Sequence, residues 1–388
     1  MRIAFYAPMK PLSDPTPSGD ATIARGLVEF LRSGGHEVVE ASALRARWIF
    51  KKPWLWPRAL WERRESRMRV EDARADLWLT YHAYYKAPDV LGPWCARRAG
   101  IPYAIFQGIY STKRAKTLGT RLGFELNRKS LLAAAHVFTN KLRDLENLAR
   151  IIPSEHLTYV PPGIVPGRFV FDPASRKALR ARIGAGEAPV VATAAMFRPG
   201  VKVRGLTYLI ERLGELARQG RAFRLLVAGD GPCREELLEL ARRELPDRAF
   251  FLGRVPREEM AGFLSSADLF AFPGIRESLG MVYLEAQSVG LPVVAFDNDG
   301  VPEVVARDET GLLTPPFDDE AFRAALARLL DDRVLRRGMG ERAEARVRRV
   351  HDLFRNYAQA ETILAGLADR PLTELFARKA SPSGAKRR

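Results

Sequence analysis

Short apolar runs alternate with helical segments along this chain of 388 residues, and this alternation limits the fold more than any other feature. Runs such as RIAFYAP (2–8) and LPVVAF (291–296) are apolar almost throughout, which indicates strands buried on both faces. Such strands, separated by helices, form parallel sheets with helices on both sides. The sequence therefore predicts an α/β protein with strands at residues 2–8, 36–41, 76–81, 102–106, 136–140, 157–160, 189–195, 223–229, 249–253, 268–272, 291–296 and 311–315.

One segment, VPPGIVPGRF (160–169), breaks the alternation with three prolines and two glycines, which is typical of a linker between domains. We therefore predict one domain over residues 1–167 and a second over 168–350. Each is long enough to bury its own core. Residues 351–370 predict a closing helix that crosses back to the first domain, and residues 371–388 predict a basic tail without fixed structure.

The formal net charge of +16 is unevenly distributed. Residues 1–167 carry 26 Lys and Arg against 15 Asp and Glu, residues 168–377 carry 31 of each, and the tail adds five cations. The excess indicates an anionic partner for the first domain. No apolar run is long enough to cross a bilayer, the start lacks a signal-peptide core, and Cys95 and Cys233 have no metal-ligand or disulfide spacing. We therefore expect a cytoplasmic protein.

Two glutamates eight residues apart, Glu277 and Glu285, lie in the stretch PGIRESLGMVYLEAQSVGLPVVAF (273–296). The spacing of the apolar residues from Leu279 to Val289 predicts a helix, with Glu277 in the loop before it and Glu285 two turns into it. Ligands bind parallel sheets at the carboxyl ends of the strands. Carboxylates in that place can accept hydrogen bonds from sugar or ribose hydroxyls.

This stretch resembles the Glu-x7-Glu signature of glycosyltransferase family 4, a family of retaining "group 1" enzymes with the GT-B fold. The resemblance implies two doubly wound Rossmann-like domains facing each other across a cleft, the first binding an acceptor and the second a nucleotide-sugar. It implies that Glu285 binds the ribose hydroxyls and Glu277 the hydroxyls of the transferred sugar. The backbone amides that open the helix can face a phosphate, namely those of Gly280, Met281 and Val282.

Two further segments of the second half resemble the family. AAMFRPGVKVRGLTYLI (194–210) resembles the segment in which an Arg and a Lys from one loop hold the donor diphosphate. Arg198 matches the Arg, and either Lys202 or Arg204 could serve as the Lys, because Arg204 occupies the usual Lys position before a glycine. Such cations would stabilise the leaving nucleoside diphosphate.

FLGRVPREEM (251–260) resembles the loop that holds the base, with Arg254 and Val255 as the expected contacts. In LVAGDGP (226–232), Gly229 and Gly231 are expected to serve backbone geometry rather than a ligand.

The resemblance is thinner in the first half. Gly19, at a predicted helix start, is expected to let the backbone approach a ligand closely, and Asp20 to favour the helix dipole. His82, just past a predicted strand, resembles a family His that contacts the acceptor or donor sugar. Gln107 stands where relatives often carry His, which removes one candidate proton shuttle.

The resemblance implies same-face transfer, in which the leaving phosphate takes the acceptor proton and the protein supplies positioning and charge. We expect no cofactor and no metal, because the donor loops hold no paired acids. Asp297 and Asp299 (FDNDG) are interpreted as loop acids.

The segment Arg45–Arg74 holds ten Lys and Arg against four acids, and four of the six tryptophans. This composition favours an interfacial helix on anionic lipid. The alternative is a solvated helix whose tryptophans pack on the first domain, since Pro53 and Pro57 interrupt a long amphipathic helix. A second basic cluster comprises Lys113, Arg114, Lys116, Arg121, Arg128 and Lys129. Both clusters suit an anionic glycan or lipid-linked acceptor, such as a lipopolysaccharide core, at the inner face of the cell membrane.

Other classes remain open. The charge and the interleaved aromatics also suggest a nucleic-acid-binding protein, but no recognised binding module accompanies them. A sugar-nucleotide epimerase, a phosphorylase or a non-catalytic relative would keep the fold. A phosphorylase would need a cofactor lysine site, and we find none. The intact Glu277 and Glu285 argue against a non-catalytic relative, whereas Gln107 and the displaced Lys leave that possibility open.

Overall fold

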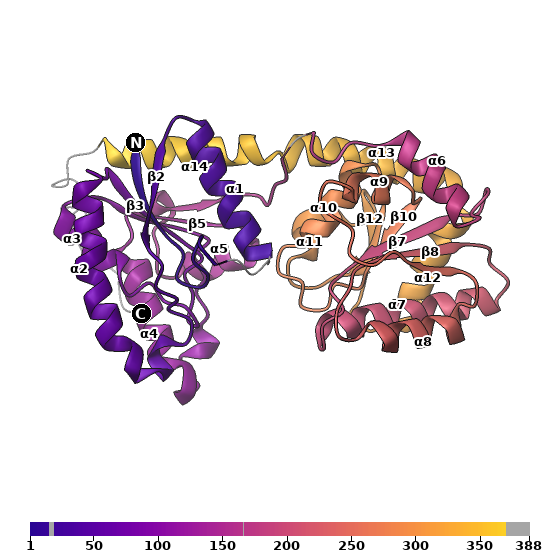
Figure 1. The fold of residues 1–388 in the computed structure, drawn as a ribbon, viewed down its shortest axis with the longest axis horizontal. Helices are drawn as coiled ribbons and strands as arrows, with labels where there is room; N and C mark the ends of the chain where they lie inside the picture. Colours follow the sequence, from indigo (N-terminus) through magenta and orange to yellow (C-terminus); the bar gives the residue numbers. More distant parts are fainter. Residues whose placement is uncertain (15–18, 166, 370–388) are drawn as a thin grey trace, which may run out of the picture. The chain divides into compact units, whose positions relative to one another are not determined.

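The computed structural model describes residues 1–14, 19–165 and 167–369 (Figure 1). The chain forms two compact units. Among the described residues, unit 1 holds those of Met1–Val160 and those from Tyr357 to Asp369, and unit 2 holds those of Pro161–Asn356. The basic tail predicted at 371–388 lies outside the described residues. Among the described residues, no helix combines the length and the apolarity needed to cross a lipid bilayer.

Unit 1 is built around a parallel sheet with the strand order β2-β1-β3-β4-β5-β6. Its strands are β1 (Arg2–Tyr6), β2 (Glu37–Ser42), β3 (Leu77–Tyr81), β4 (Tyr103–Phe106), β5 (His136–Thr139) and β6 (Leu157–Tyr159). Its helices include α1 (Gly19–Ser33), the short η1 (Ile49–Lys51) and η2 (Pro53–Leu55), α2 (Trp56–Asp72), α3 (Gly92–Ala99), η3 (Thr112–Arg114), α4 (Leu118–Ala133), α5 (Leu142–Leu148), η4 (Ser154–His156) and α14 (Leu353–Ala368).

The chain reverses its direction across this sheet between β1 and β3. Helix α1 leads from β1 to β2, whereas α2 leads back past β1 to β3. Because such crossovers are right-handed, the two helices cover opposite faces, as Figure 1 shows for α1 and for α2 with α3. The loops after β1 and β3 therefore part at the carboxyl edge, where doubly wound sheets bind ligands.

Helix α14 completes the core of unit 1. The ring of Tyr357 meets Phe30 of α1 and Phe106 of β4 edge-on, with centroids 5.6 and 5.5 Å away. Near the middle of the helix, the Glu361 carboxylate lies 2.6 Å from His36 Nε2. The C-terminal helix is thus held to unit 1 by both ring packing and a polar contact.

Unit 2 repeats the architecture with the strand order β12-β11-β10-β7-β8-β9. Its strands are β7 (Val190–Ala194), β8 (Arg224–Ala228), β9 (Ala249–Phe251), β10 (Leu269–Ala271), β11 (Val293–Phe296) and β12 (Gly311–Thr314). Its helices are α6 (Pro173–Arg182), α7 (Val201–Arg218), α8 (Arg234–Glu244), α9 (Met260–Ser265), α10 (Met281–Ser288), α11 (Val301–Val304), α12 (Asp319–Asp331) and α13 (Arg333–Val350).

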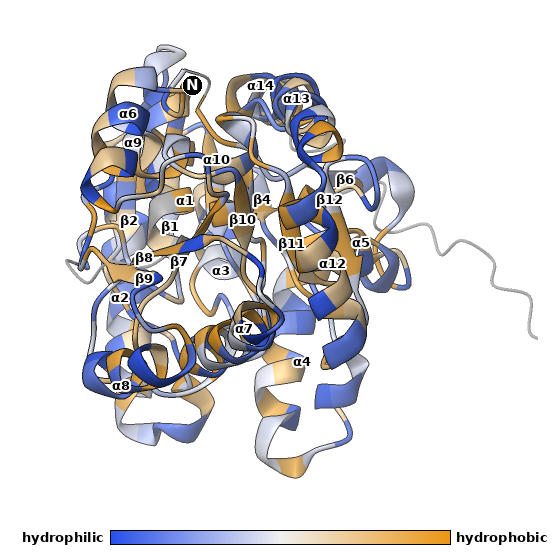
Figure 2. Cartoon of the chain, turned by 90° about the vertical axis from the view of Figure 1, so that its right-hand side faces the viewer, coloured by the Kyte–Doolittle hydropathy of each residue, from blue (hydrophilic) through white to orange (hydrophobic). Residues whose placement is uncertain are grey.

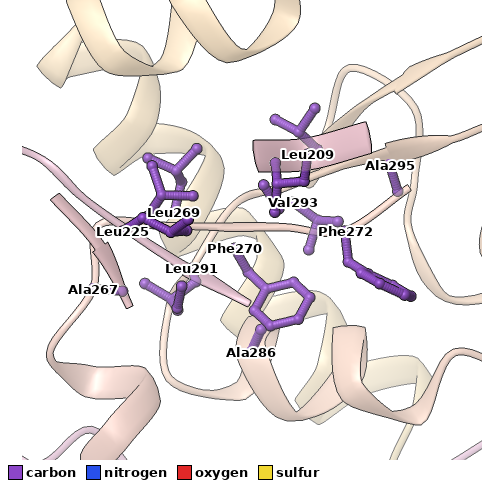
Figure 3. Packing of buried hydrophobic residues seen from close by; sticks show 14 of the residues in the cluster. Leu209, Leu225, Ala267, Leu269, Phe270, Phe272, Ala286, Leu291, Val293 and Ala295 are labelled. Atoms are coloured by element: carbon purple, nitrogen blue, oxygen red, sulfur yellow. The ribbon is translucent and has the colours of Figure 1, made fainter. Parts of the chain in front are cut away.

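Helices cover both faces of the second sheet. Within unit 2, α7 packs against α8 and α12 on one face, and α6, α9, α10 and α13 lie on the other (Figure 1). Leu225, Leu269, Phe270 and Val293 fill the space between strands and helices and are fully buried (Figure 3). Helices α7 and α8 show hydrophobic and hydrophilic stretches in alternation, as helices with one buried side do (Figure 2).

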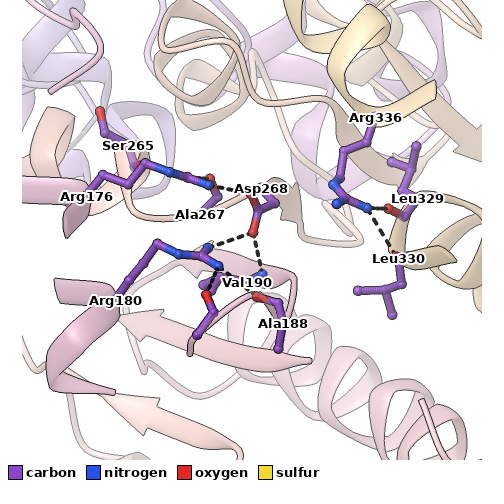
Figure 4. Close-up of polar contacts among 11 residues, drawn as sticks. Arg176, Arg180, Ala188, Val190, Ser265, Ala267, Asp268, Leu329, Leu330 and Arg336 are labelled. Carbon is purple, nitrogen blue, oxygen red and sulfur yellow. Dashed lines mark hydrogen bonds and ion pairs between the residues drawn. The ribbon is translucent and has the colours of Figure 1, made fainter. Parts of the chain in front are cut away.

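An ion-pair network fixes α6 to the sheet of unit 2 (Figure 4). The Asp268 carboxylate, directly before β10, accepts hydrogen bonds from Arg176 at 2.6 Å, from Arg180 at 2.8 Å and from the Val190 backbone N–H at 2.8 Å. Burial raises the pKa of Asp268, but the hydrogen bond and charge of Arg176, with Val190 and Arg180, lower it overall. Asp268 therefore stays ionised inside the protein.

The structure confirms two doubly wound parallel sheets, and every predicted strand is present within two residues of its expected ends. Both cysteines lie in the described residues and are free thiols.

Candidate functional site

The second sheet has its reversal between β7 and β10, which are neighbours with Phe270 opposite Ala192. The chain runs from β7 to one side of the sheet and from β10 to the other, so the two following loops part at the carboxyl edge. Arg198 lies in the loop after β7, and Glu277 lies in the loop after β10. The topology thus brings together two segments that are about 80 residues apart, as parallel sheets do with their carboxyl ends.

Glycines shape the loop that carries Glu277. Gly274 and Gly280 have φ angles of 70° and 63°, a region that favours glycine. A Cβ on Gly280 would lie 2.5 Å from a ring atom of Tyr283, whose hydroxyl donates a hydrogen bond of 3.0 Å to the Phe272 carbonyl. This packing leaves no room for a side chain at the start of α10.

The left-handed turn at Gly280 corrects one expectation. Helix α10 begins at Met281, so Glu285 lies one turn into the helix and not two. Gly280 stands directly before the helix, and Met281 and Val282 form its first turn, with their side chains half-buried against the core of unit 2.

Lys202 and Glu277 form an ion pair at the carboxyl edge of the sheet. The Lys202 ammonium also lies 5.3 Å from the ring centroid of Phe272. Lys202 and Arg204 belong to the start of α7 and not to the preceding loop, because Gly200, with φ 114°, ends that loop. The two cations point to different neighbours, since the Arg204 guanidinium lies 5.6 Å from the ring of Phe317.

Glu285 is enclosed, with 12% of its side chain exposed, and the Arg257 guanidinium lies 3.6 Å from its carboxylate. Burial raises the pKa of the Glu285 carboxyl to about 7, although Arg257 and Arg168 each lower it. Arg257 also lies over the ring of Phe169, 5.9 Å from its centroid. Sequence reasoning missed Arg257 and Arg168, because they come from separate loops and carry no motif of their own.

Arg254 and Val255 line a pocket of about 760 Å³ between α6, α9 and the loop after β9. Arg168 lines it too, so the pocket adjoins the surroundings of Glu285, but neither Glu277 nor Glu285 is among its lining residues. Among the described residues this is a hollow beside the predicted base loop, separate from the glutamate pair.

Gly229 and Gly231 have the backbone role that the sequence predicted. Their φ angles are 147° and 151°, which favour glycine. A Cβ on either residue would overlap the backbone of Ala195 or Phe197, in the loop after β7. These glycines therefore let the loops after β7 and β8 pack against each other.

In unit 1, His82 and Gln107 follow the neighbouring strands β3 and β4, where Tyr81 pairs with Phe106. Both have left-handed backbones, with φ angles of 59° and 65°. The backbone N–H of His82 donates a hydrogen bond of 2.8 Å to the Phe106 carbonyl, and the His82 ring stacks on Tyr84 with ring centroids 4.7 Å apart. Two adjacent residues held in an uncommon conformation suggest a functional position.

Gln107 is buried, and its side-chain carbonyl has no hydrogen-bond partner among the described residues. Gly19 begins α1, directly after residues 15–18, which lie outside the described part of the chain. The side chain of Asp20 is likewise outside what the structure describes, so its predicted role at the helix dipole stays a prediction.

The basic segment Arg45–Arg74 forms η1, η2 and α2. Pro53 begins η2 and Pro57 lies in the first turn of α2, so neither interrupts the helix that runs from Trp56 to Asp72. The tryptophans divide between the two predicted alternatives: Trp54 and Trp61 are 70% and 55% exposed, whereas Trp48 and Trp56 are half-buried.

The sequence model of the family described as "Glycosyl transferases group 1" matches residues 186–346, which lie in unit 2. An alpha-D-kanosaminyltransferase of Streptomyces kanamyceticus is 36% identical over 171 residues, which are 44% of this chain and 44% of that protein. A GDP-mannose-dependent alpha-(1-6)-phosphatidylinositol monomannoside mannosyltransferase of Mycolicibacterium smegmatis is 36% identical over 188 residues, 46% of this chain and 48% of that protein. The chain thus spans about half the length of the curated relatives it matches.

The solved structure of Anabaena Alr3699/HepE in complex with UDP-glucose matches with a TM-score of 0.70 at 19% identity, covering 94% of this chain and 100% of that chain. Other solved glycosyltransferase structures are also similar to this chain over most of its length. These similarities show that the chain has the GT-B fold, with two Rossmann-like units. Over the matched residues, which lie in unit 2, the chain is thus similar to group 1 glycosyltransferases.

Proposed function

We propose that this protein is a retaining glycosyltransferase of family 4, which moves a sugar from a nucleotide-sugar to a glycan or glycolipid acceptor. The observation that carries the proposal is the pairing of Lys202 with Glu277 at the reversal point of the second sheet, in the loop that leads into α10 and the enclosed Glu285. The relatives that match over part of this chain are named glycosyltransferases, and HepE was solved with UDP-glucose.

Donor binding is assigned to unit 2. Glu285 accepts hydrogen bonds from the ribose hydroxyls, and Glu277 accepts them from the transferred sugar. The diphosphate lies against the first amides of α10, where the partial positive charge of a helix N-terminus favours anions. Arg198 and Lys202 stabilise the charge that develops on the leaving group. The base lies against the loop at Arg254 and Val255.

The reaction needs positioning more than a strong base. In same-face transfer the bond from the anomeric carbon to the diphosphate breaks as the acceptor oxygen approaches from the same side. The departing phosphate takes the acceptor proton, so no side chain has to hold it. Lys202 and Arg198 then stabilise the diphosphate electrostatically, and His82 contacts a sugar hydroxyl from unit 1. No metal or other cofactor takes part in this scheme.

The acceptor is assigned to unit 1, where the excess of positive charge lies. One relative is named for a phosphatidylinositol mannoside acceptor and another for kanosaminyl transfer. We propose a glycan or lipid-linked acceptor of the cell envelope, such as lipopolysaccharide, met at the cytoplasmic face of the membrane by the exposed apolar and basic residues of unit 1.

The test is a thermal-shift screen of UDP-, GDP-, ADP- and CMP-sugars without added metal. Saturable stabilisation by one nucleotide is expected, and its loss in Glu285→Ala would tie it to the donor site. Transfer that survives in Glu285→Ala would refute the site. Nucleotide binding without transfer to any acceptor would favour a non-catalytic relative, and conversion of the sugar without an acceptor would favour an epimerase.

A further inference from the structure

A second pocket, of about 440 Å³, lies in unit 1 between the loop after β2 and the start of α2. Its charged lining is entirely basic, from Arg45, Arg47, Lys52 and Arg58. Arg45 lies 3.7 Å from the carboxylate of Asp14 and is partly compensated. Among the described residues, no carboxylate pairs with the other three. Three cations around one hollow repel each other unless an anion lies between them.

Trp48 lines the same pocket in a conformation that is rare for a bulky residue. Its φ angle is 60°, and its backbone N–H donates a hydrogen bond of 2.6 Å to the Lys86 carbonyl. Such a backbone persists only where the surroundings impose it, and it is a frequent feature of ligand sites. The ring of Trp48 is thereby held beside the cations.

A row of aromatic rings connects this pocket to the predicted catalytic His82. His82 stacks on Tyr84 at 4.7 Å, Tyr84 meets Tyr85 at 5.7 Å, and Tyr85 meets Trp48 at 5.9 Å between ring centroids. These residues lie at the carboxyl edge of the sheet, after β2 and β3, where ligands bind in this topology. Flat rings with an apolar face suit the C–H faces of sugars.

Cations accompany the row. The Arg114 guanidinium lies 4.7 Å from the centroid of Tyr85, and the Lys51 ammonium lies 4.8 Å from that of Trp48. Positive potential therefore extends along the rings and is concentrated in the pocket. This arrangement fits an acceptor whose sugars lie on the row and whose anionic group lies at its far end.

We propose that the pocket binds a phosphate group of the acceptor, held by Arg47, Lys52 and Arg58, while the sugars between that phosphate and the reacting hydroxyl lie along the row to His82. A phosphomonoester carries close to two negative charges at neutral pH and offers three acceptor oxygens, which matches three cations better than a single carboxylate does. The inference rests on the proposed function, because it names the acceptor class for the same reaction.

The test uses glucose 6-phosphate as the probe, with glucose and glucuronate as comparisons, in calorimetric titrations of the full chain. We expect binding of glucose 6-phosphate well above that of either comparison. Arg47→Gln and Arg58→Gln should each weaken it about tenfold, as loss of one charge-assisted hydrogen bond does. Arg64→Gln is the matched control, since Arg64 is exposed on the same helix outside the pocket.

If Arg58→Gln and Arg64→Gln bind glucose 6-phosphate equally well, the pocket is not the binding site. If the protein binds glucuronate as tightly as glucose 6-phosphate, the pocket is not specific for a phosphate group. Vesicles of phosphatidic acid and of phosphatidylglycerol, matched in zeta potential, separate the possible sources. Arg58-dependent preference for phosphatidic acid without binding of glucose 6-phosphate would assign the pocket to a lipid headgroup and overturn the acceptor. Nucleotide stabilisation measured on the same variants shows that they fold, and its absence in the wild type would refute the proposed function separately.

Discussion

At the scale of single residues, Glu285 combines burial with a proposed role, binding ribose hydroxyls, that needs its negative charge. Its pKa is raised to about 7 from an ordinary 4.5, so near neutral pH a large share of the molecules carries a proton there. Ribose hydroxyls donate to the ionised form, so nucleotide binding should release that proton. We predict that nucleotide affinity rises with pH up to about 7 and then levels off. Calorimetry in buffers of different ionisation enthalpy measures the proton release.

The raised pKa of Glu285 also makes the stability of the folded protein depend on pH, but stability falls as the pH rises, whereas nucleotide affinity increases. Because the folded protein holds the Glu285 proton more tightly, its contribution to stability is full below pH 4.5 and is lost as the pH rises through about 7. Glu285→Gln should therefore be more stable than the wild type at pH 8, by up to about 3 kcal/mol, while it loses nucleotide binding. The exposed Glu239→Gln is the control and should change neither property. Identical pH profiles for wild type and Glu285→Gln would contradict the shift.

Lys202 and Arg204 are distinguished by where their charges lie. Lys202 pairs with Glu277, whereas Arg204 lies over Phe317. We predict that Lys202→Ala weakens binding of a nucleoside diphosphate by about ten- to a hundredfold, the value of a charge-assisted hydrogen bond. Arg204→Ala should weaken binding of the same nucleoside diphosphate by less than threefold. Titrations with UDP and uridine, or the base that the screen selects, test this, because only the diphosphate should be affected.

At the scale of elements, the start of α10 depends on one glycine. Gly280→Ala would place a Cβ at a φ of 63° and 2.5 Å from the ring of Tyr283. We predict destabilisation by about 1–3 kcal/mol and weaker nucleotide binding, because the amides of the first turn would shift. Gly26→Ala in α1 is the control, since a Cβ there meets no atom within 4 Å among the described residues and alanine favours helix. Urea denaturation of both variants measures the difference.

The Asp268 network should behave as a buried ion pair. Asp268→Asn removes the charge that Arg176 and Arg180 share, so we predict a loss of about 3–5 kcal/mol in the free energy of unfolding. The lowered pKa of Asp268 means that its contribution is present above pH 3.8 and is lost as the pH falls further. Asp331→Asn, which breaks a surface pair with Arg221, should cost less than about 1 kcal/mol. Equal losses in the two variants would contradict the distinction.

The strands were predictable and several site contacts were not, for physical reasons. Strands buried on both faces need continuous apolar runs, and this local requirement is visible in the sequence. The start of α10 depends on the left-handed Gly280, and apolar spacing alone extended the helix too far. The contact of Arg257 with Glu285 depends on how the loop after β9 packs against helix α10, and no local pattern encodes that.

At the scale of the whole molecule, the two units share one architecture but differ in net charge. Residues 168–377 carry equal numbers of cations and anions, some of them joined in networks such as that of Asp268, whereas residues 1–167 carry the cationic excess. The sequence predicted this division, because composition needs no coordinates. It did not predict which tryptophans are exposed, since Trp48 and Trp56 differ from Trp54 and Trp61 only in how η1, η2 and α2 pack on the sheet.

Exposed apolar side chains lie beside the basic residues of unit 1, and together they argue for membrane association. Trp54 is 70% exposed in η2, and Leu118 is 88% exposed at the start of α4, which packs near η1. Trp and Leu next to Lys and Arg bind anionic bilayers through burial of the apolar groups and attraction to lipid charge. We predict that the protein floats with vesicles containing phosphatidylglycerol, less so as salt rises, and poorly with phosphatidylcholine alone.

The variants separate the apolar from the electrostatic share. Trp54→Ser with Leu118→Ser should reduce flotation at every salt concentration, whereas Lys113→Gln with Lys116→Gln should reduce it mainly at low salt, because screening already weakens exposed charges at high salt. Val334→Ser is the matched control, since Val334 is 83% exposed but lies on α13 of unit 2. If Val334→Ser lowers the recovery of protein with vesicles as much as the unit 1 variants do, flotation reflects non-specific adsorption of exposed apolar residues. The cationic excess of unit 1 would then be attributed to acceptor binding alone.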